Sequence, residues 1–142
     1  MLPKEALSAR VVLLAGKEPI LRLRALKTLA DSADDDFDRQ NFDGDQGSPS
    51  DWLAAVGTAP FLAEHRTVVV RHLLRADSPN ALAIKGLPSY SKLILVADDE
   101  SATSVDAEQK FDRRLTAWSK LVKSEGGCVA IFDVSPNKVK ET

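Results

Sequence analysis

The sequence predicts an α/β domain with a five-stranded, mostly parallel sheet and helices on both faces. Two observations predict this fold class. Several short runs consist almost wholly of Val, Leu, Ile and Ala without polar alternation, which is typical of strands buried on both faces. Segments with helical spacing of apolar residues separate these runs. Strands that alternate with helices favour a parallel sheet with right-handed crossovers.

The first strand is expected at residues 10–15, an apolar run that ends at Gly16. A helix follows, because Pro19 is tolerated in a first turn, where its missing N–H costs little. Apolar residues then recur at spacings of three and four, which predicts a stripe facing the core: Ile20, Leu23, Leu26, Ala30 and Ala33. The acidic residues 34–36 end this helix in a polar loop.

A polar strand and a short helix come next. Residues 37–43 predict a modest strand that is polar enough to lie at a sheet edge, and residues 44–47 have the composition of a turn. Ser48 is followed by Pro49 and, three residues on, by Asp51, which is a helix-start signature. The helix has one apolar face and ends at a glycine: Trp52, Leu53, Val56 and Gly57.

The second half of the chain repeats this alternation. A strand rich in β-branched residues is expected at 67–71, a helix at 78–86 and a buried strand at 92–97. The longest helix is expected at 106–124, because four large apolar residues follow its turns: Phe111, Leu115, Trp118 and Val122. A glycine pair caps it, and the last strand is expected at 128–132.

Composition limits the function classes. The 142 residues predict a single domain, 1–142. A net charge of -2 and a pI near 5.7 argue against gripping nucleic acid by bulk charge. The one cysteine, Cys128, excludes an internal disulfide and is expected to be a buried, inert thiol. No apolar run approaches the roughly 18 residues of a membrane span, and residues 1–5 lack a signal-peptide core, so we expect a cytoplasmic protein.

The turn after the first strand does not fit a nucleotide site. A phosphate-binding loop needs several glycines and then Lys with Ser or Thr, whereas residues 15–19 read Ala-Gly-Lys-Glu-Pro. Glu18 would repel a phosphate. Asp98 and Asp99 follow a buried strand as the magnesium-holding acids of ATPases do, but without a phosphate loop they have nothing to act on.

Other catalytic and metal-binding patterns are also missing from the sequence. His65 and His72 have no Cys or His partner at zinc-ligand spacing and are interpreted as surface residues. The acidic residues between 34 and 45 lack the spacing of a calcium loop, and no nucleophile elbow is present. We therefore expect no catalytic residues, cofactor or metal, which favours a scaffold or a binding module.

Five segments resemble, in order, one known family. They are a strand with Gly-x-Glu-Pro-Ile-Leu at 12–21, Phe-Asp-Gly-Asp at 42–45, the Pro60-Phe61-Leu62 block leading into a strand at 58–71, the strand 93–96 and the strand 127–129. Together they resemble the N-terminal domain of the delta subunit of bacterial DNA polymerase III, the clamp-loader subunit that opens the sliding clamp. The resemblance implies an AAA+/RecA-like core that has lost its phosphate loop. It also implies that this domain has no catalytic site of its own in the polymerase holoenzyme.

The resemblance implies a partner site as well. In the family, two adjacent apolar residues after the small helix enter the peptide-binding pocket of the sliding clamp, the beta subunit. They correspond here to Phe61 and Leu62, which follow Pro60. Family members continue into C-terminal domains that join the other loader subunits, and they meet DNA only in the full assembly. The chain therefore resembles a clamp-binding domain of a longer protein.

Further residues are expected to flank this element. Trp52 and Val56 on the preceding helix would support or flank it, and Arg66 and Arg71 would steer the approach to an acidic clamp surface.

Three alternatives remain open from the sequence. Phe61 and Leu62 could pack beneath the sheet, as large apolar residues mostly do. The chain could be a nucleotide hydrolase with a degenerate site at Lys17, Asp98 and Asp99. It could also be an interaction module of some other assembly.

Overall fold

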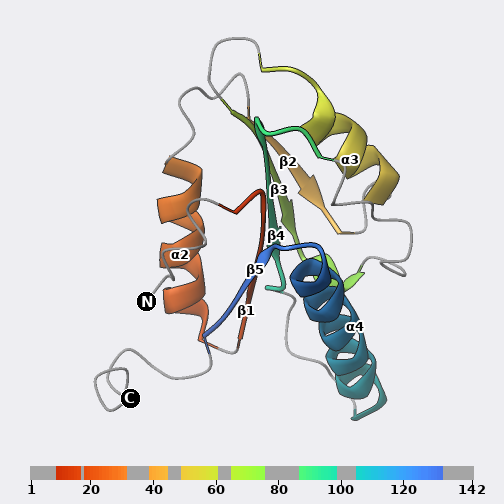
Figure 1. The fold of residues 1–142 in the computed structure, drawn as a ribbon. Coiled ribbons are helices and arrows are strands. Elements are labelled where there is room, and N and C mark those ends of the chain that lie inside the picture. Colours follow the sequence, from red (N-terminus) through yellow and green to blue (C-terminus); the bar gives the residue numbers. More distant parts are fainter. Residues whose placement is uncertain are drawn as a thin grey trace.

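The computed structural model describes residues 9–16, 18–31, 39–44, 49–60, 65–75, 87–98 and 105–132. Over these residues the chain forms one five-stranded sheet with helices on both faces (Figure 1). In chain order the elements are β1 Val11–Ala15, α2 Pro19–Asp31, β2 Arg39–Asp43, α3 Pro49–Gly57, β3 Arg66–Arg71, the 3-10 turn η2 Leu73–Arg75, β4 Ser91–Val96, α4 Val105–Ser124 and β5 Cys128–Ile131.

The strands lie in the order β2-β3-β4-β1-β5, and all four neighbouring pairs are parallel. Parallel neighbours require crossover connections, which the helices supply. The central strands β1 and β4 are buried along their whole length, which explains their continuous apolar sequences. The α/β fold with helices on both faces is confirmed, and the described sheet is parallel throughout.

Successive strand residues point to opposite faces and fill two separate cores. The first core lies under α3 and α4 and holds Leu13 and Leu95 with the indole rings of Trp52 and Trp118, whose centroids are 6.1 Å apart. The second core lies under α2 and includes Leu14 and Val96 of the same two strands. The sheet is therefore the shared wall of both cores.

The buried face of α2 agrees with the predicted stripe only at Leu26. Ile20 and Leu23 are 51% and 59% exposed, whereas Ala25, Leu26 and Leu29 are buried against the sheet. Residues 30 and 33, also in the predicted stripe, have side chains outside the described part of the structure. The helix carries apolar residues around most of its circumference, so two stripes fit the same spacing, and the buried one is rotated by about a quarter turn.

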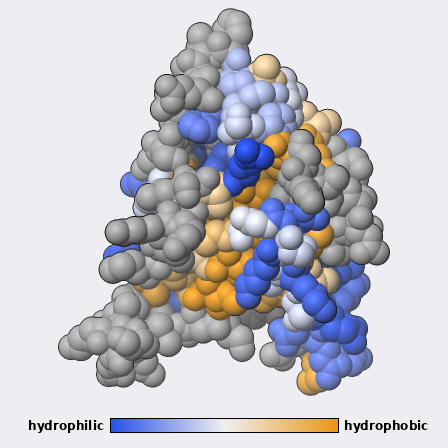
Figure 2. All heavy atoms as spheres, in the orientation of Figure 1, coloured by the Kyte–Doolittle hydropathy of each residue, from blue (hydrophilic) through white to orange (hydrophobic). Residues whose placement is uncertain are grey.

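The other described helices match their predictions. On α3, Trp52 and Val56 are fully buried, and on α4 Trp118 and Val122 are. The hydrophilic residues in Figure 2 gather over α4, at the lower right, while apolar residues gather in the middle of this face. The end of α4 is a Schellman motif: Gly127 N–H donates to Val122 O at 2.8 Å, Gly126 N–H donates to Lys123 O at 3.2 Å, and Gly126 has φ +81°.

The remaining expectations divide into three groups. The polar strand β2 does lie at the edge of the described sheet, where it pairs with β3. Cys128 is half-buried rather than buried, because β5 forms the opposite edge of the sheet. The helix expected at 78–86 lies outside the described residues. The residue that follows it, Leu87, is buried in the core under α3 and α4.

Candidate functional site

The element predicted to bind a partner begins where the chain leaves α3. Pro60 is partly buried in the short segment that follows this helix. Phe61 and Leu62 lie outside the described residues. Trp52 and Val56 point from α3 into the core. Both side chains are fully buried, so neither can contact a partner. Their contribution is to hold α3 on the sheet.

The carbonyls at the C-terminal end of α3 accept hydrogen bonds from side chains, one directly after the helix and three further along the chain. The last four carbonyls of an α-helix have no partner within the helix. Here Ala54 O accepts from Thr58 Oγ1 at 3.0 Å, and Ala55 O accepts from Arg66 Nε at 3.0 Å. Val56 O accepts from Ser91 Oγ at 2.8 Å, and Gly57 O accepts from the Tyr90 hydroxyl. We call these four side chains, Thr58, Arg66, Tyr90 and Ser91, the α3 exit cluster.

Arg66 is the most connected member of the α3 exit cluster. Besides Ala55 O, its guanidinium donates to Gln40 Oε1 on β2 at 2.8 Å, and its backbone N–H donates to Tyr90 O at 2.9 Å. The predicted flanking cation therefore joins α3, β2 and the start of β4. Sequence reasoning missed Tyr90 and Ser91 here, because nothing in their local sequence indicates a helix end far away along the chain.

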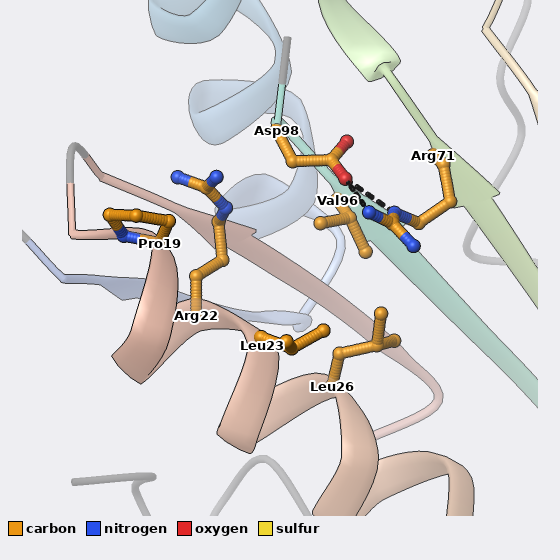
Figure 3. A pocket seen from close by; sticks show the side chains of 7 residues that line it. All are labelled: Pro19, Arg22, Leu23, Leu26, Arg71, Val96 and Asp98. Carbon is orange, nitrogen blue, oxygen red and sulfur yellow. Dashed lines mark hydrogen bonds and ion pairs between the residues drawn. The ribbon is translucent and has the colours of Figure 1, made fainter. Parts of the chain in front are cut away.

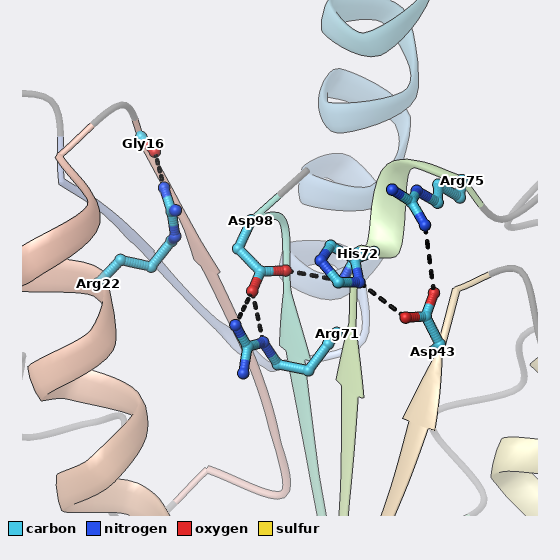
Figure 4. Close-up of polar contacts among 7 residues, drawn as sticks. All are labelled: Gly16, Arg22, Asp43, Arg71, His72, Arg75 and Asp98. Atoms are coloured by element: carbon cyan, nitrogen blue, oxygen red, sulfur yellow. Dashed lines mark hydrogen bonds and ion pairs between the residues drawn. The ribbon is translucent and has the colours of Figure 1, made fainter. Parts of the chain in front are cut away.

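A second group of polar side chains lies at the carboxyl ends of β2, β3 and β4, where open α/β sheets commonly bind ligands. The Asp98 carboxylate accepts from the Arg71 guanidinium and, at 2.7 Å, from the backbone N–H of His72 (Figure 4). His72 Nδ1 lies 2.7 Å from Asp43 Oδ2, and Arg75 Nη1 lies 4.0 Å from Asp43 Oδ1. These residues, Asp43, Arg71, His72, Arg75 and Asp98, form the carboxyl-edge cluster.

The carboxyl-edge cluster changes the interpretation of two residues. His72 was expected on the surface, but its side chain is only 30% exposed and its backbone has φ +55°, an unusual conformation that the Asp98 hydrogen bond supports. His65, by contrast, is exposed as expected. Arg71 pairs with a carboxylate that is 5% exposed, so its charge is largely compensated within the chain. Arg66 and Arg71 stand at opposite ends of β3, roughly 16 Å apart along the strand.

The turn after β1 is packed tightly against the chain that follows β5. A Cβ atom added to Gly16, which has φ +112°, would lie 2.3 Å from Phe132 O. The Glu18 N–H donates to Phe132 O at 2.8 Å, and Arg22 Nη1 donates to Gly16 O. Groups that would face a phosphate in a nucleotide-binding protein are thus engaged within the chain.

A small pocket of about 130 Å³ lies between α2 and the carboxyl end of the sheet (Figure 3). Its floor is apolar, and the guanidiniums of Arg22 and Arg71 and the Asp98 carboxylate stand at its rim. The lining residues are Pro19, Arg22, Leu23, Leu26, Arg71, Val96 and Asp98. The polar groups at the rim already have partners within the chain, because Arg71 pairs with Asp98 and Arg22 donates to Gly16 O.

No three of the described His, Cys, Asp and Glu residues gather as they would around a metal ion. None of the helices in the described ranges is long and apolar enough to cross a membrane.

Comparison with solved structures finds the same fold in the DNA clamp loader delta protein YqeN of Bacillus subtilis. The TM-score is 0.58 at 21% sequence identity, and the match covers 86% of this chain and 38% of that chain. No model of a protein family matches the sequence, and no curated protein does. The expectation that the chain folds like a clamp-loader delta subunit is confirmed, while the chain spans well under half of the length of that protein.

Proposed function

We propose that this chain is the clamp-binding domain of a DNA clamp-loader subunit, which binds and opens the sliding clamp. One observation carries the proposal: the fold matches that of a clamp loader delta protein over 86% of the chain. Because the chain spans 38% of that protein, the domains that join the other loader subunits would lie beyond it. The ordered sequence motifs described above support the same assignment.

We assign clamp contact to Phe61 and Leu62, introduced by Pro60. Trp52 and Val56 are fully buried, so the inward face of α3 has no surface to offer a partner. The large apolar residues that could contact a partner near this helix are therefore those of the segment that follows it, Phe61 and Leu62. Adjacent apolar side chains that enter a pocket act as hot spots, and each would contribute about 2 kcal/mol or more.

Clamp opening requires no ATP hydrolysis at this domain. A ligand shifts a conformational population by its differential affinity for the two states, so tighter binding to the open clamp is sufficient. The internal bonding of the turn after β1 supports a role without nucleotide, since the two donors there, the Glu18 N–H and the Arg22 guanidinium, already have partners within the chain. Asp98, one of the two acids of the alternative hydrolase site, is paired with Arg71, whereas Lys17 and Asp99 lie outside the described residues.

The assignment is tested by measuring binding of the 142-residue chain to the sliding clamp of the same organism. Surface plasmon resonance would compare the wild-type chain with Phe61→Ala/Leu62→Ala. We expect the double variant to lose at least roughly 30-fold in affinity, the equivalent of one hot-spot residue.

The matched control is Ile20→Ala/Leu23→Ala, which removes an exposed pair of large apolar side chains from α2. Its affinity for the clamp is expected to be unchanged. Circular dichroism and thermal unfolding would establish that both variants fold. A folded Phe61→Ala/Leu62→Ala variant with wild-type affinity would exclude this site, and unfolding of that variant would favour core packing of the pair.

A further inference from the structure

We propose that the α3 exit cluster positions the clamp-binding segment, and that Tyr90 and Arg66 are positioning residues that act without touching the clamp. This inference rests on the proposed function, since the partner is the sliding clamp. The observation behind it is that Ala54, Ala55, Val56 and Gly57 each have a carbonyl that accepts from a side chain.

The cluster fixes the direction in which the chain leaves α3. Helices commonly end on a glycine in a left-handed conformation, with the last carbonyls bonded to the next backbone N–H groups. At α3 the donors come instead from the first residue of β3, Arg66, and from Tyr90 and Ser91 where β4 begins. Hydrogen bonds therefore hold the end of the helix to the beginnings of β3 and β4.

The same bonds fix where the chain returns. Arg66 N–H donates to Tyr90 O, and Thr58 N–H donates to Ala55 O at 3.3 Å, so both ends of the connection 58–65 are attached to the same few groups. The Ser91 hydroxyl in this set is buried, which protects its hydrogen bond from water. Pro60 adds a fixed φ angle between these two attachments.

Fixed ends matter because binding costs the entropy of ordering the bound segment. A connection whose ends are already held loses less freedom when it enters a pocket, and so binds more tightly for the same contacts. If the ends are released, a smaller fraction of molecules has the binding-competent conformation, and the apparent affinity falls by that fraction. The loss then appears mainly in the association rate, whereas the loss of a direct contact appears mainly in the dissociation rate.

The test uses two mild variants and one matched control. Tyr90→Phe removes only the hydroxyl that donates to Gly57 O. Arg66→Lys keeps the positive charge but cannot donate to Ala55 O and Gln40 together in the same fork geometry. The control is Ser124→Ala, which removes a hydroxyl that donates to Leu121 O near the end of α4.

Two readouts are needed. The first is hydrogen exchange of the free chain, in which we expect faster exchange of the Thr58 and Ala59 amides in Tyr90→Phe and Arg66→Lys but not in Ser124→Ala. The second is clamp-binding kinetics, in which we expect both variants to associate roughly fivefold more slowly, the equivalent of one ordinary hydrogen bond, with an unchanged dissociation rate.

Each outcome decides between the two proposals. Unchanged exchange in both variants would overturn the inference, as would faster exchange with wild-type association. A change confined to the dissociation rate of Arg66→Lys would make Arg66 a direct clamp contact instead. If the wild-type chain itself does not bind the clamp, the proposed function fails, and the inference about clamp binding fails with it.

Discussion

At the scale of single residues, Lys92 lies in an unusual environment for an ionisable group. Its side chain is buried on β4, and its Nζ donates to Ala9 O at 2.6 Å. Burial lowers the pKa of Lys92 below its ordinary value of 10.5, because a desolvated ammonium is less stable than a neutral amine, while the nearby Cys128 acts in the opposite direction. The sequence showed only a lysine at the start of an apolar run.

This pKa shift predicts a pH dependence of stability. Between the lowered pKa of Lys92 in the folded chain and 10.5 in the unfolded chain, the unfolded state binds more protons. The contribution of Lys92 to the free energy of unfolding therefore rises with pH across that window and is lost as pH falls through the folded pKa. Urea denaturation between pH 7 and about pH 10 is expected to show wild type gaining stability relative to Lys92→Met.

The control is Lys120→Met, which removes an exposed lysine from α4. Its stability difference from wild type is expected to be flat with pH. The comparison is repeated in a Cys128→Ser background, because the thiol also ionises in the alkaline range. A flat difference for Lys92→Met in both backgrounds would contradict the lowered pKa.

At the scale of elements, α2 shows why helical spacing alone does not choose the buried face. Leu23 and Leu29 are the same residue type on the same helix, yet Leu23 is 59% exposed and Leu29 is fully buried. The difference comes from how the helix lies on Val12, Leu14 and Ile94 of the sheet. The long helix α4 was predicted correctly because its large apolar residues, apart from the exposed Val105 in the first turn, occupy one stripe.

The two leucines give a paired prediction. Leu29→Ala is expected to lower the free energy of unfolding by about 2 to 5 kcal/mol, because it leaves a cavity in the core under α2. Leu23→Ala is expected to change it by about 0.5 kcal/mol or less, since its side chain is mostly in water. Chemical denaturation of both variants checks this. Equal losses would mean that the stripe predicted from spacing faces the core after all.

At the scale of the whole molecule, the carboxyl ends and the amino ends of the parallel strands carry different groups of side chains. The carboxyl edge holds the compensated charges of Asp43, Arg71 and Asp98, and the amino edge holds the α3 exit cluster. In nucleotide-binding proteins of doubly wound fold the carboxyl edge carries the ligand. The proposed function instead places the partner at the amino edge, near the start of β3.

This separation predicts that ATP with magnesium does not bind the chain. If ATP bound with a Kd of 0.1 mM, 1 mM ATP would stabilise the fold by about 1.4 kcal/mol, and Tm would rise by roughly 4 °C. We expect no such shift in a thermal melt and no heat in a calorimetric titration, with a phosphate-loop ATPase as the positive control. A saturable shift that is lost in Asp98→Asn would favour the alternative hydrolase site.

The sequence predicted what depends on neighbours along the chain and missed what depends on distant partners. The strands, the start of α3 and the cap of α4 follow from local residue patterns, and the structure has them close to the predicted places. The bonds of Tyr90 to Gly57 and of Asp98 to Arg71 join residues that only the strand order brings together. The direction of the α2 face was ambiguous because too many of its residues are apolar.

The central position of β1 has a consequence for synthesis on the ribosome. Its two neighbours are β4 and β5, so Val12 pairs with Ile94 and Cys128, which are made much later. At about 5 to 20 residues per second, β5 follows β1 by roughly 6 to 23 seconds. During that interval the nascent chain carries the apolar strand Val11–Ala15 without a complete sheet to receive it. The pairing of β1 is therefore completed only after β5, the last strand of the described sheet, has been made.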